Sequence, residues 1–146
     1  MHVPYARAMI RSGRASFTVL STETDAARIS EILGVAPTNV DPRGSVRRSG
    51  RVRDQNVWRI DVGRVANTED DQTGTSALTA LLDRIRPAAG SVGRLPADCD
   101  ARIRWSAESD SAQGGFVIPS ELASDIAALG VDVYAMVFLG EDDDED

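Results

Sequence analysis

Ala-Ser-Phe-Thr-Val-Leu-Ser, residues 15–21, is the stretch that decides the fold class, because apolar and hydroxyl side chains alternate over its first five positions. This period of two predicts a strand with one buried face. A helix is expected directly after it. Thr24 or Asp25 can cap the helix, and apolar residues recur at helical spacing over residues 26–33. Gly34 then provides a left-handed stop.

The same alternation recurs further along the chain. Residues 57–62 and 101–107 each place apolar side chains opposite charged ones, which predicts two more half-buried strands. A short strand is expected at residues 116–118. The last strand, at residues 131–139, has apolar side chains on both faces, so we expect it inside the sheet.

Two further helices connect these strands. Apolar side chains at helical spacing predict a helix over residues 78–85, which Pro87 stops. Another helix is expected to begin at Ser120 and to end at Gly130. A segment rich in proline and glycine, residues 37–50, separates the first helix from the second strand and is predicted to be a loop without packed elements.

The predicted order of elements is strand, helix, strand, helix, strand, strand, helix, strand. Hairpins and strand–helix–strand crossovers together predict an α+β fold, with a mixed, mainly antiparallel sheet of about five strands and three helices packed on one face, broadly ferredoxin-like. A chain of 146 residues is long enough for one domain. We expect an N-terminal extension at residues 1–13, a single domain at 14–140 and a disordered acidic tail at 141–146.

Charge is distributed unevenly along the chain. All 16 basic residues are arginine, and six of the 23 acidic residues form the run Glu-Asp-Asp-Asp-Glu-Asp at 141–146. The rest of the chain therefore has 17 acidic residues against 16 arginines and is almost neutral. A run of like charges repels itself and buries no apolar surface, which predicts disorder. Such a tail keeps the protein soluble, or it competes for a basic site.

Nothing in the sequence indicates secretion or membrane insertion. Cys99 is the single cysteine, so no internal disulfide can form. No stretch approaches the roughly 20 apolar residues that cross a bilayer. Residues 1–14 contain scattered arginines and lack the apolar run of a signal peptide. We expect a cytoplasmic protein without a membrane partner.

The residues that enzymes use most often are missing or poorly placed. His2 is the single histidine, and there is no lysine for a Schiff base or a phosphate-binding loop. Cys99 lies between Asp98 and Asp100, whose charges raise a thiol pKa and oppose nucleophilic chemistry. No His/Cys cluster suits zinc, and the carboxylates of the acidic tail lack the loop geometry that holds calcium. The acidic residues 69–71 could attract a hard cation weakly, and solvation is the simpler explanation. We therefore expect no catalytic residues, no cofactor and no metal.

An arginine-rich loop is the first candidate binding site. It contains five arginines with no acidic residue until Asp54, namely Arg43, Arg47, Arg48, Arg51 and Arg53. Such a cluster on a nearly neutral body suits phosphate, carboxylate or an acidic protein. The alternative is a flexible loop whose charges are simply solvated.

The exposed face of the predicted sheet is the second candidate. Successive side chains of a strand point to opposite faces, so the charged residues of two strands should point away from the helices: Arg59, Asp61, Arg102 and Arg104. If the helices cover one face only, these residues lie on an open platform. Cross-strand ion pairing is the alternative explanation. No aromatic side chain is expected on that face, which weakens a nucleic-acid interpretation.

Both halves of the chain contain motifs that together form a recognisable combination. The first half has Ile-Leu-Gly-Val-Ala-Pro-Thr at residues 32–38 and Trp58 at the start of a strand. The second has Ile-Pro-Ser-Glu-Leu at 118–122 and Ala-Leu-Gly-Val at 128–131. Over residues 14–139 the combination resembles the bacterial family catalogued as domain of unknown function 4279. The resemblance implies no catalytic residue, cofactor or substrate. Small bacterial domains of this kind often lie beside toxin or phage genes, which favours an immunity-like binding role.

The sequence alone does not establish a function. The expectation that agrees best with these patterns is a non-enzymatic protein-interaction domain, an immunity or regulatory partner of a toxin or of a phage or defence component. It would use the arginine-rich loop and the open sheet face. The alternative is binding of nucleic acid or a phosphorylated ligand through the Arg43 to Arg53 loop, with the acidic tail as an internal competitor.

Overall fold

The central strand of the molecule is β1 (Ile10–Ser21), which pairs antiparallel with both β3 (Asn56–Ala66) and β4 (Cys99–Ser109). The structure is a computed structural model that describes residues 10–68, 70–71, 73–111 and 115–140. These residues form a five-stranded sheet in the order β2-β3-β1-β4-β5. β2 (Asn39–Asp41) pairs antiparallel with β3, and β5 (Asp132–Leu139) runs parallel to β4.

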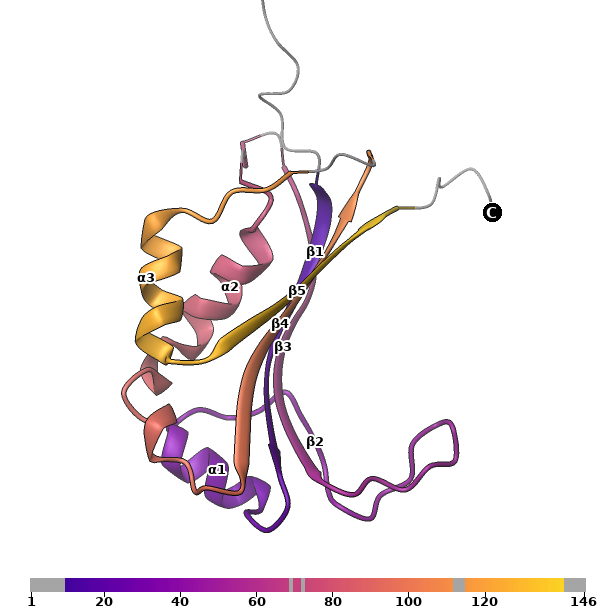
Figure 1. Ribbon diagram of the computed structural model, residues 1–146, viewed down its shortest axis with the longest axis vertical. Coiled ribbons are helices and arrows are strands. Elements are labelled where there is room, and N and C mark those ends of the chain that lie inside the picture. Colours follow the sequence, from indigo (N-terminus) through magenta and orange to yellow (C-terminus); the bar gives the residue numbers. More distant parts are fainter. Residues whose placement is uncertain (1–9, 69, 72, 112–114, 141–146) are drawn as a thin grey trace, which may run out of the picture.

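The α-helices of the described chain all lie on one face of this sheet, as Figure 1 shows. They are α1 (Ala26–Leu33), α2 (Ser76–Ile85) and α3 (Ser120–Leu129), and the short 3-10 turns η2 (Arg86–Ala88) and η3 (Val92–Arg94) link α2 to β4. The strands β2-β3-β1-β4 have the order of a ferredoxin-like unit, which α3 and β5 extend by one parallel strand. The predicted α+β fold, with a mixed and mainly antiparallel sheet, is confirmed.

The apolar face of β1 forms the centre of the core. Phe17 is fully buried and meets Trp58 edge to face, with ring centroids 6.1 Å apart. Trp105 from β4 and Leu81 from α2 belong to the same buried cluster. Burying a large apolar side chain stabilises a fold by about 1.5–3 kcal/mol relative to leaving it exposed. The alternation along β1 therefore determines which face of the sheet the helices cover.

The start of α1 resolves the choice between two caps. Asp25 is the N-cap, and its side chain accepts a hydrogen bond from the backbone N–H of Arg28 at 2.9 Å. Thr24 instead donates its hydroxyl hydrogen to Asp98 at 2.8 Å. Gly34 ends the helix with a φ of 73°, the left-handed conformation that its position predicted. Thr24 is thus available to join α1 to the loop before β4.

The short strand predicted at residues 116–118 is absent from the structure, where this segment lies outside the sheet. Val117 donates its backbone N–H to the carbonyl of Thr73 at 2.8 Å, and the Thr75 hydroxyl donates to the Val117 carbonyl at 2.9 Å. Phe116 packs its ring edgewise against Trp105, at 4.8 Å between centroids. The loop before α2 satisfies this backbone, so the segment needs no strand partner.

β5 lies at an edge of the sheet, which makes the predicted interior position wrong. Within the described residues β5 pairs with β4 alone. Only Val133 is partly buried, whereas Met136 and Leu139 are 65% and 60% exposed. Apolar side chains on both faces usually mean that the chain's own sheet and helices cover them. In the part of the chain that the structure describes, neither face of β5 is covered over most of its length.

The folded region begins earlier in the chain than expected. β1 begins at Ile10, before the expected domain start at residue 14, and Ile10 is buried in the core. Residues 10–13 therefore belong to the sheet. The remainder of the expected extension and the acidic tail at 141–146 lie outside the described residues.

Candidate functional site

Residues 43–53 fold back on themselves as a hairpin that holds one isolated bridge, between Val46 and Val52, and no strand of the sheet. The loop predicted at residues 37–50 is therefore wrong at β2, which pairs with β3. Three backbone hydrogen bonds of 2.8 Å join the arms of the hairpin, from Gly44 N–H to the Arg53 carbonyl, from Arg53 N–H to the Ser45 carbonyl and from Arg47 N–H to the Arg51 carbonyl. We call residues 43–53 the arginine hairpin. Figure 1 shows it between β2 and β3, projecting on the side of the sheet opposite the helices.

The five arginines of the arginine hairpin separate into two groups. At its base, Arg43 donates to the carbonyl of Thr22 at 3.2 Å and lies 3.7 Å from the carboxylate of Glu23. Arg53 lies 3.4 Å from the carboxylate of Asp41. At its tip, three exposed side chains have no acidic partner in the part of the chain that the structure describes: Arg47, Arg48 and Arg51. The tip therefore presents three cations, while the base arginines hold the hairpin in place.

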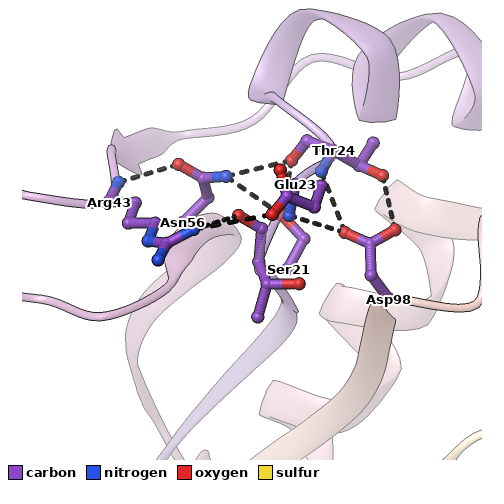
Figure 2. Close-up of polar contacts among 7 residues, drawn as sticks. Ser21, Glu23, Thr24, Arg43, Asn56 and Asp98 are labelled. Atoms are coloured by element: carbon purple, nitrogen blue, oxygen red, sulfur yellow. Dashed lines mark hydrogen bonds and ion pairs between the residues drawn. The ribbon is translucent and has the colours of Figure 1, made fainter.

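A polar network fixes the base of the arginine hairpin to the turn between β1 and α1 (Figure 2). The backbone N–H of Arg43 donates to Asn56 Oδ1 at 2.7 Å, and the Asn56 side-chain N–H donates to the Thr24 carbonyl at 3.2 Å. Asp98 Oδ2 accepts from the backbone N–H groups of Glu23 and Thr24 at 2.8 and 2.9 Å. The hairpin is thereby connected to β1, β3 and the loop before β4.

Hydrogen bonding in this network shifts the protonation of Asp98. The backbone N–H of Thr24, then that of Glu23 and the Thr24 hydroxyl, lower the pKa of Asp98 from 3.8 to about 2. The pKa of the neighbouring thiol shifts in the opposite direction. Burial raises the pKa of Cys99, and the charge of Asp98 raises it further, as the sequence indicated. Cys99 is therefore a weak nucleophile at neutral pH.

The sheet face opposite the helices, which we call the open face, carries arginines on its long strands. Two rows of residues cross it from β3 over β1 to β4: Arg59, Thr18 and Arg102 in one row, and Asp61, Ser16 and Arg104 in the next. All four charged residues expected on this face lie there. The small hydroxyl side chains of β1 separate the arginines of its neighbours.

Ion pairing accounts for only part of the charge on the open face. Arg102 pairs with Asp100 of its own strand, and its guanidinium lies 4.9 Å from the centroid of the Tyr134 ring. Arg59 donates to a threonine hydroxyl at a long 3.5 Å. Among the described residues, neither Arg59 nor Arg104 has an acidic partner. The expected cross-strand pairing therefore leaves two cations unneutralised.

Aromatic side chains do lie on the open face, contrary to the expectation. Tyr134 is in register with Arg104, and Phe138 is in register with Glu108. The expectation considered only the two strands that carry the charged residues. The parallel register of β5 against β4 places both rings beside the charged residues of β4.

Two further arginines of the open face were missed. Arg14 and Arg64 lie directly opposite each other on β1 and β3, and both are exposed. The alternation of β3 is broken beyond Asp61, where the register shifts and Gly63 adopts a φ of 73°. Because of this irregularity, a simple period of two does not predict the face of the sheet on which Arg64 lies. The signal that could have found it is the glycine in the middle of a strand.

A hollow of about 220 Å³ lies between α2 and α3. Its cation, Arg86, donates to Asp83 at 2.8 Å and lies 3.3 Å from Asp125. These partners raise the pKa of Arg86, the hydrogen bond to Asp83 most. The charges of this hollow link two helices, so we assign it a structural role.

A family model described as a domain of unknown function, DUF4279, matches residues 11–135. The chain belongs to this family. The match covers the sheet from β1 into β5, and the resemblance inferred from the motifs is confirmed. The DUF4279 description names no activity. No curated protein and no solved structure matches the chain.

In the part of the DUF4279 chain that is described, no helix is both long and apolar enough to cross a membrane. The same residues contain no group of three or more His, Cys, Asp or Glu side chains placed to hold a metal ion.

Proposed function

We propose that this DUF4279 protein is a non-enzymatic protein-interaction domain that binds an extended segment of its partner along the free edge of β5. The observation that supports the proposal is an eight-residue apolar strand exposed at the edge of the sheet. An edge strand offers unpaired backbone N–H and C=O groups. A partner strand can pair with these groups, while side chains on both faces supply specificity.

The side chains of β5 suit a partner better than they suit solvent. On the helix face Val137 and Leu139 are exposed, and on the open face Met136 and Phe138 are exposed. Edge strands that stay unpaired are commonly protected by lysine or proline. β5 has neither, and Asp132 at its start is its only charged residue.

A second segment of the chain also exposes apolar side chains. It comprises the three residues before Pro119, each at least 40% exposed: Phe116, Val117 and Ile118. Phe116 packs on Trp105, which is in register with Ala135 of β5. Trp105 is itself buried, so the two exposed apolar segments lie on either side of one buried ring. Exposed apolar patches of this kind mark interaction sites.

The partner that we expect is a protein of the same bacterial cytoplasm, either a toxin that the domain neutralises or a phage or defence component that it regulates. Such roles require binding without chemistry. An apolar edge strand supports binding of this type because strand pairing needs no catalytic group on either side.

Affinity purification from the native host tests the proposal. The full chain is compared with a double variant, Val137→Asp with Leu139→Asp, which places two charges on the helix face of β5. A matched control, Val46→Asp with Val52→Asp, alters two valines on the arginine hairpin that are 66% and 63% exposed. We expect at least one protein to be retained by the wild type and the control and lost from the β5 variant.

Circular dichroism of the three proteins shows whether each variant is folded. If no protein is specifically retained, or if the folded β5 variant retains the same proteins as the wild type, the proposal is wrong.

The alternative function, nucleic-acid or phosphorylated-ligand binding through the arginine hairpin alone, has weaker support. Arg43 and Arg53 have acidic partners, which leaves three of the five arginines for an anion. The open face carries more unpaired arginines and also aromatic rings, so it is the better candidate for such a ligand.

A further inference from the structure

We infer that the open face is a second binding site and that its ligand is single-stranded nucleic acid. The residues that form it are Arg14, Arg64 and Arg104, with the rings of Tyr134 and Phe138 beside them. This activity differs from strand pairing at β5 because it uses no backbone edge, and the two surfaces share the ring of Phe138.

The three arginines lie close together. Arg14 is directly opposite Arg64 on one side and Ser106 on the other, and Arg104 is two residues from Ser106 along β4. Adjacent strands are about 4.8 Å apart and two residues along a strand span about 7 Å, so the three Cα atoms fit within roughly 12 Å. All three side chains are exposed, and none has an acidic partner within the described chain. Asp61 lies in the same row as Arg104, so the three arginines outnumber the neighbouring acid and the site has a net positive charge.

This arrangement costs stability in the absence of a ligand. Like charges directly opposite each other on neighbouring strands repel, and Arg14 and Arg64 are such a pair. A bound phosphate would remove the repulsion and could accept hydrogen bonds from both guanidinium groups. The geometry therefore favours an anionic ligand over an empty face.

The surface between the arginines is hollowed and leaves room for a phosphate group. A shallow hollow of about 80 Å³ is lined by small side chains, arginines and one ring: Ser12, Gly13, Arg14, Arg64, Ser106, Glu108 and Phe138. Glu108 is the acidic member of this set, and Arg11 lies 3.8 Å from its carboxylate, which offsets its charge. A phosphate in the hollow would contact hydroxyl and guanidinium groups.

The aromatic rings distinguish nucleic acid from other polyanions. Tyr134 and Phe138 are 51% and 47% exposed on the same face, and four residues of strand place them about 13 Å apart. Bases stack on such rings while arginines hold the backbone. An acidic peptide would meet the arginines and leave the rings uncovered. Stacking requires unpaired bases, which selects a single strand.

The arginine hairpin adds charge on the same side of the sheet. Figure 1 shows it projecting beyond the open face, away from the helices. Its unpaired tip arginines are Arg47, Arg48 and Arg51. They extend the positive surface at the β2–β3 end, so a strand longer than a few nucleotides would gain further phosphate contacts.

Fluorescence anisotropy with a labelled oligothymidylate of about 12 nucleotides tests the inference. The full chain should bind it in low salt, and the affinity should fall as salt rises. The double variant Arg14→Gln with Arg64→Gln removes two phosphate contacts. We expect it to bind at least about tenfold more weakly, and the slope of log affinity against log salt to lose roughly 1.4 in magnitude. Tyr134→Leu should weaken binding by about fivefold or more.

The matched control is Arg84→Gln with Arg94→Gln, which makes the same charge change on exposed arginines of the helix side. It should change the affinity by less than about twofold, because charges distant from the site are screened. A labelled glutamate peptide of equal charge should bind more weakly than the oligonucleotide. No binding in low salt, equal losses in both double variants, or equal affinity for the peptide would each overturn the inference.

Discussion

At the scale of single residues, Asp98 connects segments that are far apart in sequence. Its carboxylate accepts hydrogen bonds from Glu23 and Thr24, more than seventy positions earlier in the chain. Thr24 in turn accepts a hydrogen bond from Asn56, which holds the backbone of Arg43. One carboxylate thus supports the turn before α1 and, through it, the base of the arginine hairpin.

Asp98→Asn should destabilise the protein in a pH-dependent way. Folding lowers the pKa of Asp98 from 3.8 to about 2, so its contribution is fully present above pH 3.8 and is lost as the pH falls through about 2. Urea unfolding should show a lower midpoint for the variant at neutral pH and a smaller difference near pH 2. Asp54→Asn, an exposed carboxylate, should change little at either pH. A difference of the same size at both pH values would contradict this assignment.

Gly74 is a position where an added methyl group has no space. Its φ is 78°, and a Cβ would lie 2.8 Å from Cγ1 of the buried Ile10. Gly34 has a similar φ of 73° but nothing within 4 Å of the same position. Gly34→Ala should therefore cost only the left-handed penalty of about 1–2 kcal/mol, and Gly74→Ala should cost about 1–3 kcal/mol more. Chemical denaturation measures the free energy of unfolding of both variants. Equal losses would show that the chain around Ile10 moves and relieves the clash.

Arg14 on β1 and Arg64 on β3 should lower the free energy of unfolding and raise the affinity for an anionic ligand. Arg64→Thr removes the repulsion opposite Arg14 and adds a residue that favours strands. We expect the free energy of unfolding to rise by roughly 0.2–1 kcal/mol, while the affinity for the oligothymidylate falls. Thermal melts and anisotropy on the same preparations test both directions. A variant that is less stable, or that binds as well as the wild type, would remove the argument for an anion at this pair.

At the scale of elements, the periodicity of side chains predicted most of the fold. β1, β3 and β4 each alternate around buried residues such as Phe17, Trp58 and Ile103, and each α-helix has one apolar side. These patterns are local, because burial of every second side chain on a strand follows from backbone geometry alone. The mixed sheet and the single helix-covered face followed from the order of the elements, whereas the edge position of β5 did not.

The elements that could not be predicted are those whose surroundings are decided by distant parts of the chain. Residues 116–118 resemble a strand, but Thr73 and Thr75 satisfy the backbone N–H and C=O of Val117. β5 has the composition of an interior strand, and composition cannot say whether the same chain or a partner covers it. For the candidate site, four expected charged residues lie on the open face. Arg14 was missed because the predicted strand began at Ala15, and Arg64 because an irregularity in β3 interrupts the period of two.

At the scale of the whole molecule, opposite charges occupy different regions. The acidic run at 141–146 begins directly after Gly140, which follows β5, and the arginines lie on the open face and the arginine hairpin. Six extended residues span at most about 20 Å, and β3 is about 14 Å from β5 across the sheet. The run therefore has the reach to compete with a polyanion for Arg14 and Arg64.

Deletion of residues 141–146 should change two properties at once. The net charge of −7 becomes −1, which removes both the competitor for the arginines and the repulsion between exposed β5 edges. We expect tighter, salt-sensitive binding of the oligothymidylate and more self-association in sedimentation velocity at low salt. Replacing the six acids by serine and glycine separates charge from length. If neither property changes in either variant, the acidic run serves some purpose other than competition or solubility.

The most direct test of the central claim, that the free edge of β5 is a protein-binding surface, is hydrogen–deuterium exchange of the full chain alone and bound to the protein it retains from the host. Strand pairing places backbone N–H groups of β5 in new hydrogen bonds. The peptides that contain residues 132–139 should therefore gain the largest protection on binding, with a smaller gain at 116–118. Unchanged exchange in these peptides, with protection elsewhere on the surface, would contradict the claim.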